Sequence, residues 1–344
     1  MLRMLIALIV SAAVVLAMGP KFIPVLRKMK FGQTIYELGP QSHKTKQGTP
    51  TMGGRMIAAG AVVAALVCQT GTPGWGFMLP LVLVAGLSMA VGFADDYNKV
   101  VKKRSLGLTP WQKIAGQVII AVGFSAYCYF HPQVGSAIYI PFANVEWDLG
   151  IFYIPLLSLT VLFMINSANL QDGLDGLLSS VTAVGGTAWG MMALFFMLAV
   201  ADTSAAYGQN LYSAAIFGLA VAGAAMGFLR FNHYPATVFM GDTGSMVIGG
   251  ATVGLALLLR QPFMLLLIAF TMVMSSVSVI IQRYYYKATR KIFGEPRRLF
   301  KMTPIHHHFE LSGMSETQIV AMYAVVTGIL SLVAILSLYG LKVA

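Results

Sequence analysis

Charged residues are scarce in this sequence of 344 residues. Asp, Glu, Lys and Arg make up 10% of it and hydrophobic residues make up 57%, whereas about a quarter of the residues of a soluble globular protein are charged. Acidic residues are the scarcer kind, with 12 Asp and Glu against 23 Lys and Arg. The composition therefore excludes an ordinary soluble domain and indicates that lipid is the main solvent of the chain.

Cysteine is also rare. The only two cysteines, Cys68 and Cys128, lie inside apolar runs, where a free thiol behaves as a small buried hydrophobic group. We therefore expect neither a disulfide framework nor a cysteine-ligated metal site.

Long apolar runs are abundant and recur from the first residues almost to the last. A helix needs about 20 apolar residues to cross the hydrocarbon core, and the runs lack the two-residue alternation of membrane β-strands. The first run continues into Gly19-Pro20-Lys21 and further apolar segments, which argues against a cleaved signal peptide. We predict a single all-α polytopic membrane domain spanning residues 1–344, with about ten transmembrane helices near 4–20, 53–70, 77–94, 111–130, 151–167, 177–200, 212–229, 244–260, 263–282 and 319–340.

Lys and Arg cluster in alternate loops between these runs. They concentrate at 21–55, 99–113, 230 and 283–301, whereas the loop at 131–150 contains acids but no Lys or Arg. By the positive-inside rule, the first set of loops is cytoplasmic and both termini lie on the periplasmic or extracellular side. The same cations also suit an anionic headgroup or a nucleotide diphosphate.

Two adjacent carboxylates, Asp95 and Asp96, end the third apolar run on the predicted cytoplasmic side. A helix C-terminus disfavours anions, so the pair needs compensation, which Lys99, Lys102, Lys103 and Arg104 can supply. An Asp pair is a common helix terminator. The alternative is a carboxylate that deprotonates a lipid phosphate or alkoxide.

A second polar stretch closes the fifth run. Asn166, Asn169, Asp172 and Asp175 recur every three residues, and that spacing places neighbours on one helix face. The glycines after Asp172 let a ligand approach backbone N–H groups. A turn or a calcium-loop-like sequence is the simpler reading, but we favour a substrate site, because such a stretch rarely begins inside a membrane helix.

The third stretch, residues 230–245, contains Asn232, Phe239, Gly241 and Asp242 and ends where an apolar run begins. Asp242 stands where a helix N-cap would stand, which needs no substrate. A hard carboxylate beside a helix N-terminus also suits Mg²⁺ bound to a diphosphate. Several acids on one membrane face favour the metal.

Two loops add basic and imidazole groups. Lys46 and Thr51 belong to a Gly-rich basic loop at 42–55, which lacks the spacing of a P-loop and is equally explained as a connector. His306, His307 and His308 are consecutive, so at most two can point at one ligand. Contact with a diphosphate or a sugar is plausible chemistry for imidazole.

These motifs together resemble the phospho-N-acetylmuramoyl-pentapeptide transferase family of polyprenyl-phosphate N-acetylhexosamine-1-phosphate transferases. The similarity rests on Gly48 to Gly54, Phe93 to Tyr97, Asn169 to Gly176, Phe239 to Ser245 and Pro304 to Glu310. The aspartate motifs resemble the wider superfamily, whereas the triple-histidine loop resembles the muramoyl-pentapeptide branch.

The resemblance implies an Mg²⁺-dependent enzyme with a cytoplasmic active-site cleft, in the bacterial plasma membrane and as a homodimer. Its donor would be UDP-MurNAc-pentapeptide and its acceptor undecaprenyl phosphate, with lipid I and UMP as products and no nucleic-acid partner. Asp242 would bind the metal, and Asp95 and Asp96 would act on the lipid phosphate. The substrate-contacting positions would be Lys46, Thr51, Lys99, Asn166, Asn169, Asp172, Asp175, Asn232, Phe239, Gly241, Gln282, His306, His307 and His308.

Two alternatives remain open from the sequence. A sibling transferase could use an N-acetylglucosamine donor, and the loop at 304–310 is the feature that discriminates it. An ion-coupled transporter also has about ten helices, but its charges should lie near the bilayer midplane. The carboxylates gather on one face instead, which suits a donor arriving from the cytoplasm.

Overall fold

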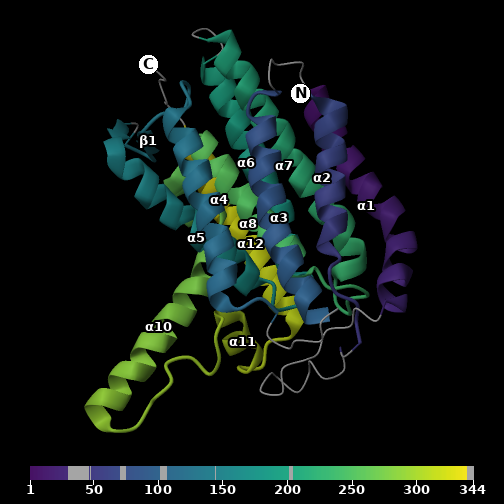
Figure 1. Ribbon diagram of the computed structural model, residues 1–344, viewed down its shortest axis with the longest axis vertical. Coiled ribbons are helices and arrows are strands. Elements are labelled where there is room, and N and C mark those ends of the chain that lie inside the picture. The colour runs from purple at the N-terminus through teal and green to yellow at the C-terminus, as the bar shows by residue number, and fades with distance from the viewer. Residues whose placement is uncertain are drawn as a thin grey trace.

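The computed structural model describes residues 1–29, 46, 48–69, 75–100, 107–143, 145–200 and 204–338. Most of it is a bundle of long helices, and α1 begins and α12 ends at the same end of that bundle (Figure 1). The helices are α1 (Leu2–Lys28), α2 (Gly54–Cys68), α3 (Met78–Val100), α4 (Pro110–Phe130), α5 (Tyr153–Gln171), α6 (Leu177–Val200), α7 (Ala205–Asn232), α8 (Gly241–Leu258), α9 (Leu265–Ile268), α10 (Phe270–Phe293), α11 (Ile305–Glu310) and α12 (Glu316–Leu336). Short 3₁₀ turns, η3 (Gly150–Phe152) and η4 (Pro262–Met264), precede α5 and α9.

Apolar length explains most of these helices. Eight of them are long and apolar enough to cross a membrane, and α9 with α10 forms a further pair bent by 89°. Helix α2 is apolar but shorter, and each of the ten predicted runs falls on one of these elements. The prediction of an all-α polytopic membrane protein is confirmed at this level.

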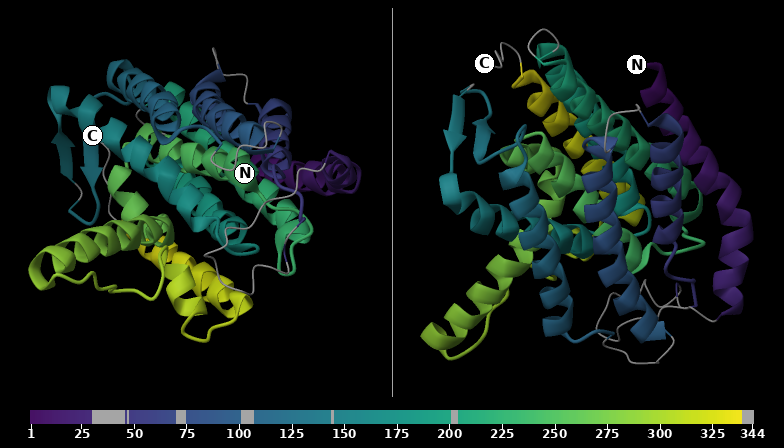
Figure 2. Two further views of the ribbon diagram at one scale, coloured as in Figure 1. Left: turned by 60° about the horizontal axis from the view of Figure 1, so that its bottom comes forward. Right: turned by 45° about the horizontal axis from the view of Figure 1, so that its top comes forward.

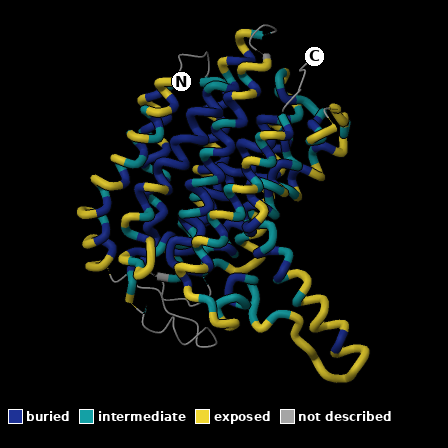
Figure 3. Tube along the Cα trace, turned by 180° about the vertical axis from the view of Figure 1, so that it is seen from behind, coloured by how far each residue is buried: buried dark blue, intermediate teal, exposed yellow. Residues whose placement is uncertain are grey.

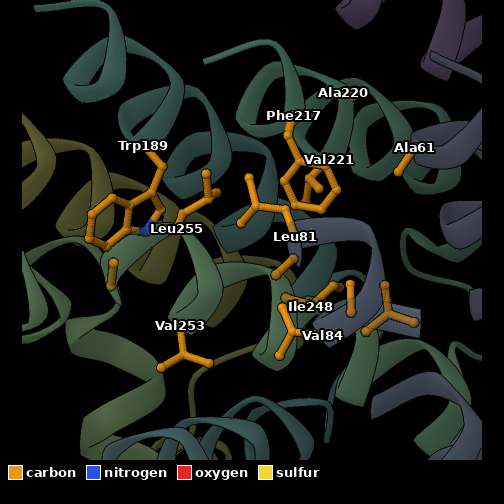
Figure 4. Packing of buried hydrophobic residues seen from close by; sticks show 14 of the residues in the cluster. Ala61, Leu81, Val84, Trp189, Phe217, Ala220, Val221, Ile248, Val253 and Leu255 are labelled. Carbon is orange, nitrogen blue, oxygen red and sulfur yellow. The ribbon is translucent and has the colours of Figure 1, made fainter. Parts of the chain in front are cut away.

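Helix α8 occupies the middle of the bundle and carries the candidate site at its first turn. Every residue from Thr243 to Leu258 is buried, and Leu81, Val84, Phe217 and Ile248 pack together in the surrounding core (Figure 4). A Cβ on Gly54 would lie 2.0 Å from the Gly244 Cα, so α2 and α8 meet backbone to backbone. Small residues at such crossings are how membrane helices achieve close packing.

The loop at 131–150 holds a feature that the sequence did not predict. It forms an antiparallel hairpin of β1 (Ala137–Ile140) and β2 (Val145–Asp148), in which Ile138 pairs with Trp147. Arg260 holds the hairpin to the end of α8, because its guanidinium lies 2.7 Å from the Glu146 carboxylate and donates to the Ala137 carbonyl at 3.0 Å. Figure 2 shows the hairpin at one edge of the bundle.

Candidate active site

Asp242 lies at the second position of α8 and gathers side chains from three other helices. Its Oδ2 accepts hydrogen bonds from the Nζ atoms of Lys99 and Lys113, each at 3.0 Å. Its Oδ1 accepts from the Asn169 amide at 2.8 Å. Helices α3, α4 and α5 thus bring two cations and an amide to one carboxylate, although these residues are far apart in the sequence.

The adjacent carboxylates of α3 have different partners. Asp95 lies within hydrogen-bonding reach of the Asp242 carboxyl, contacts Lys99 at 2.6 Å and accepts from the Leu108 backbone at 2.8 Å. Asp96 instead accepts from the backbone N–H groups of Asp242 and Thr243 at 3.2 and 2.9 Å. Asp95 therefore faces the site, whereas Asp96 caps α8 from a neighbouring helix.

This arrangement corrects two details of the sequence reading. The alternative reading of Asp242 as an N-cap is wrong, because α8 begins at Gly241 after Met240 and Asp96 accepts from free N–H groups of its first turn. The Asp pair does not end the third helix, since α3 continues to Val100. The carboxylates therefore lie in its last turns, with Lys99 one turn beyond Asp95.

Gly241 makes the close approach between these segments possible. Its φ is +73°, a conformation that costs glycine little. A Cβ there would lie 2.7 Å from the Asp96 Oδ2 and 2.8 Å from the Thr51 Oγ1. Thr51 is buried, so the end of the basic loop, residues 48–54, packs against the start of α8.

A second charged cluster lies beside the first. The Lys46 Nζ contacts the Asp175 Oδ1 at 2.8 Å and the Glu316 Oε2 at 2.6 Å, and all three side chains are largely buried. Asp175 also accepts from the Ala236 N–H at 2.9 Å. The cluster therefore joins the Lys46 loop, the segment after α5, the segment before α8 and the first turn of α12.

Asp172 lies between these two clusters. It is half-buried, and burial, with the nearby carboxylates of Asp242, Asp96 and Asp175, raises its pKa to about 8. A cation nearby favours the charged form of a carboxyl group and lowers its pKa. A cation bound near Asp172 would therefore lower its pKa towards the ordinary value for Asp.

Three of the residues predicted to contact substrate have hydrogen-bond partners within the protein. Asn166 exchanges hydrogen bonds with Gln117 of α4, the shorter at 2.8 Å. Asn232 accepts from Ser179 at 2.8 Å and donates to the Val238 carbonyl at 3.1 Å. Gln282 accepts from the N–H groups of 299 and 300, both at 3.0 Å. These contacts fix the elements around the site, and contact of the three side chains with a substrate stays a prediction.

Phe239 belongs to the segment that leads into α8. It is half-buried, and its backbone pairs with the basic loop, donating to the Pro50 carbonyl at 2.8 Å and accepting from the Gly53 N–H at 2.9 Å. Two hydrogen bonds to the basic loop therefore fix the backbone that carries the aromatic ring.

The three histidines form the short helix α11. His306 is buried and packs against Gly173, where an added Cβ would lie 2.3 Å from its Nε2. His307 contacts Glu310 at 3.1 Å, and His308 accepts from the Lys301 N–H at 3.1 Å. His306 thus packs directly against the segment that carries Asp172 and Asp175.

An apolar cavity of about 800 Å³ runs beside α5 towards the site. Its walls come from α5, η4, α9, α10 and the hairpin, and they include Leu162, Phe163, Leu170, Phe263 and Val279. Asn166 also lines it, one helical turn before Asn169, which bonds to Asp242. The cavity therefore suits an apolar ligand, and Asn166 in its wall lies one helical turn from the Asp242 cluster.

The donor set fits Mg²⁺ in one particular way. Among the described residues, no group of three or more His, Cys, Asp or Glu is arranged to hold a metal. Mg²⁺ in phosphoryl-transfer sites commonly takes one or two carboxylates and completes its shell with substrate phosphates and water. The neighbouring carboxyl groups of Asp95 and Asp242 fit that mode.

Sequence reasoning missed Lys113 and Glu316 as site residues. Lys113 appeared only as one of several loop cations, and Glu316 appeared in no motif, although both contact predicted residues directly. Their partners lie 129 and 270 residues away, so no local pattern marks them. Residues 42–45, Gln47, Lys102, Lys103 and Arg104 of the basic loops lie outside the described residues.

Comparisons with known proteins show the family of the chain. Residues 78–260, more than half of the chain, match the model of glycosyl transferase family 4. Proteins described as phospho-N-acetylmuramoyl-pentapeptide-transferase are similar along nearly the whole length: 44% identical in Heliobacterium modesticaldum, covering 93% of both chains, and 41% identical in Clostridium perfringens, covering 98% of this chain and 97% of the relative. The chain therefore belongs to the phospho-N-acetylmuramoyl-pentapeptide-transferase family, a branch of the family 4 glycosyl transferases.

Proposed function

We propose that this chain transfers phospho-N-acetylmuramoyl-pentapeptide from UDP-MurNAc-pentapeptide to undecaprenyl phosphate, producing lipid I and UMP. The observation that carries the proposal is the Asp242 cluster, in which two ammonium groups and an amide converge on one carboxylate beside Asp95. The similarity to phospho-N-acetylmuramoyl-pentapeptide-transferases supports the donor, and the apolar cavity supports a lipid acceptor.

The donor diphosphate would lie at the first turn of α8. Lys99 and Lys113 hold their ammonium groups 3.0 Å from Asp242, and the positive end of a helix dipole adds to their field. Preorganised cations of this kind stabilise charge that develops on a leaving group. Phe239 is available to stack on uracil, and Lys46 with Asp175 would border the nucleoside.

The acceptor would enter through the cavity beside α5. Its phosphate would reach Asp95 near Asn169, with the polyprenyl chain along Leu162, Phe163 and Leu170. A phosphate oxygen of the acceptor attacks the β-phosphorus of the donor, a new P–O–P bond forms, and the bond to the UMP oxygen breaks. Asp95 takes the remaining proton of the acceptor phosphate, and UMP leaves as the anion.

Mg²⁺, when bound by Asp242, would neutralise the negative charge of the donor diphosphate as UMP leaves. The role of Asp96 is different, because its carboxylate holds Asp242 and Thr243 through their backbones. We therefore assign the proton transfer to Asp95 and the positioning of Asp242 to Asp96.

The finer membrane arrangement belongs to the same proposal. We infer ten crossings, counting α2 and the bent pair with the eight long helices, with the site on the cytoplasmic side and both termini outside. The Lys and Arg distribution supports this orientation. The homodimer implied by the resemblance stays a prediction, to be measured as the mass of the detergent-solubilised protein.

A direct test is transfer by the purified protein. With radiolabelled UDP-MurNAc-pentapeptide, undecaprenyl phosphate and Mg²⁺, we expect a lipid-linked labelled product and stoichiometric UMP. Unlabelled UDP-N-acetylglucosamine in excess should compete poorly. Efficient use of that second donor would favour the sibling transferase, and solute movement into liposomes without UMP would favour a transporter.

A further inference from the structure

The second half of α10 leaves the bundle and projects away from it (Figure 1). Residues 281–301, here called the arm, include the end of α10 and the segment that returns from it. Almost all of the arm is exposed (Figure 3), and Tyr284 and Ile292 are exposed by 68% and 71%. Large apolar side chains exposed on a projecting element indicate a site that contacts another protein or a membrane.

The arm is a built element with its own internal contacts. Thr289 is buried and accepts from the Arg297 N–H at 2.9 Å, so the returning segment is bonded to the helix. Gln282 fixes the same segment nearer the bundle through two backbone N–H groups. The Arg297 guanidinium also lies 4.7 Å from the Phe293 ring. The exposed face is therefore presented in one orientation.

Helical spacing divides the projecting part of α10 into three faces. Gln282 and Thr289 face the returning segment. Exposed apolar residues at three- and four-residue spacing form a second face, namely Ile281, Tyr284, Tyr285, Ala288 and Ile292. Arg283, Lys287 and Arg290 form a third face, at spacings of four and three.

The charge of the arm is strongly one-sided. It contains seven Lys and Arg residues and one acidic residue, Glu295. None of these cations forms an ion pair with a carboxylate in the part of the chain that the structure describes. An apolar face with unpaired cations on the opposite face is the pattern of a helix that lies in the interface of an anionic membrane.

We propose that the arm docks on the leaflet surface beside the candidate site and binds anionic phospholipid headgroups there. Ile281, Tyr284 and Ile292 enter the acyl boundary, and Arg283, Lys287 and Arg290 contact the lipid phosphates. Continuity supports this partner, because the first half of α10 already lines the lipid-suited cavity with Val273, Val279 and Ile280. The inference depends on membrane insertion alone and not on the transferase reaction.

Spin labelling of the full chain tests this proposal. The native cysteines are buried, so a nitroxide can be attached selectively to Ile292→Cys, with Leu332→Cys as a lipid reference and Ser312→Cys as a water reference. Single copies in nanodiscs of phosphatidylcholine, with or without phosphatidylglycerol, are exposed to oxygen and to a water-soluble nickel chelate. The same label is then measured with Arg283, Lys287 and Arg290 all changed to Gln.

With phosphatidylglycerol, we expect the label at 292 to resemble the one at 332, open to oxygen and protected from nickel. Each cation near an anionic leaflet contributes about 1 kcal/mol, or about fivefold, so the triple change should lower the docked-to-free ratio by about a hundredfold. Nickel access equal to that at 312 in anionic discs would overturn the proposal. Equal protection from nickel in neutral and anionic discs would also overturn it. That comparison uses the protein in which Arg283, Lys287 and Arg290 are unaltered.

Discussion

The Asp96 carboxylate bonds to both the backbone N–H and the hydroxyl of Thr243, at 2.9 and 2.6 Å. Asp95, its neighbour in the chain, makes no such contact with α8 and faces the Asp242 carboxyl instead. Two adjacent acids of one motif thus have separable tasks, and substitutions should separate them.

Asp96→Ala should destabilise the protein, because it leaves N–H groups of the first turn of α8 without an acceptor. We expect the free energy of unfolding to fall by about 1–3 kcal/mol, measured as a lower thermal midpoint in detergent. Asp95→Asn should keep the midpoint and lose activity by about 10²-fold or more. Equal midpoints for the two variants would contradict the separation.

Lys113→Gln should slow transfer by about 10²-fold, because it removes one of the two cations at the Asp242 carboxylate. The effect should appear in kcat and in the apparent donor affinity, with the lipid KM little changed. Lys21→Gln, which changes an exposed cation of α1, serves as the matched control. A wild-type rate for Lys113→Gln would exclude its ammonium from the reaction.

Glu316→Gln should loosen the buried cluster around Lys46. One carboxylate oxygen holds both the Lys46 ammonium and the Asp175 N–H, and charge-assisted hydrogen bonds contribute about 1.5–3 kcal/mol. We expect a lower thermal midpoint and a higher donor KM than in Glu295→Gln, an exposed control. If the midpoint and the KM both match the control, Glu316 has no positioning role.

Asp172→Asn should alter the pH dependence of stability. Because the pKa of Asp172 is about 8 in the folded protein and 3.8 in the reference state, the folded state binds the proton more tightly, and stability falls as pH rises between about 4 and 8. The variant lacks this loss, so its thermal midpoint should gain on the wild type as pH rises from about 5 to 8. If the thermal midpoints of the variant and the wild type change in parallel with pH in the presence of a chelator, the raised pKa of Asp172 is contradicted.

The fold was predictable because lipid imposes a length and a composition on each crossing. All ten apolar runs correspond to helical elements, and the acids at 95, 172, 175 and 242 belong to one region. The hairpin was not predictable, because the loop at 131–150 is short and its strands have only four residues each. The 89° bend between α9 and α10 was equally hidden inside one apolar run.

The chemistry of the site was predictable only where residues form local motifs. Asn169 and Asp242 each stand in a recognisable stretch, and they bond directly. Lys113, which also contacts Asp242, stands in the first turn of an otherwise ordinary apolar helix. Asn232 and Gln282 hydrogen-bond to the backbone of Val238 and Phe300, contacts that no local pattern in the sequence predicts.

The most direct test of the proposed site is the rate of UMP release by Asp242→Asn across a range of Mg²⁺ concentrations. The substitution is nearly isosteric, so the protein should remain folded in the membrane, and the Asn169 contact offers a hydrogen bond in either case. We predict a rate at least about 10²–10³-fold below wild type that does not recover at saturating Mg²⁺. Wild-type turnover at saturating Mg²⁺ would contradict the assignment of Asp242 to the metal and the diphosphate.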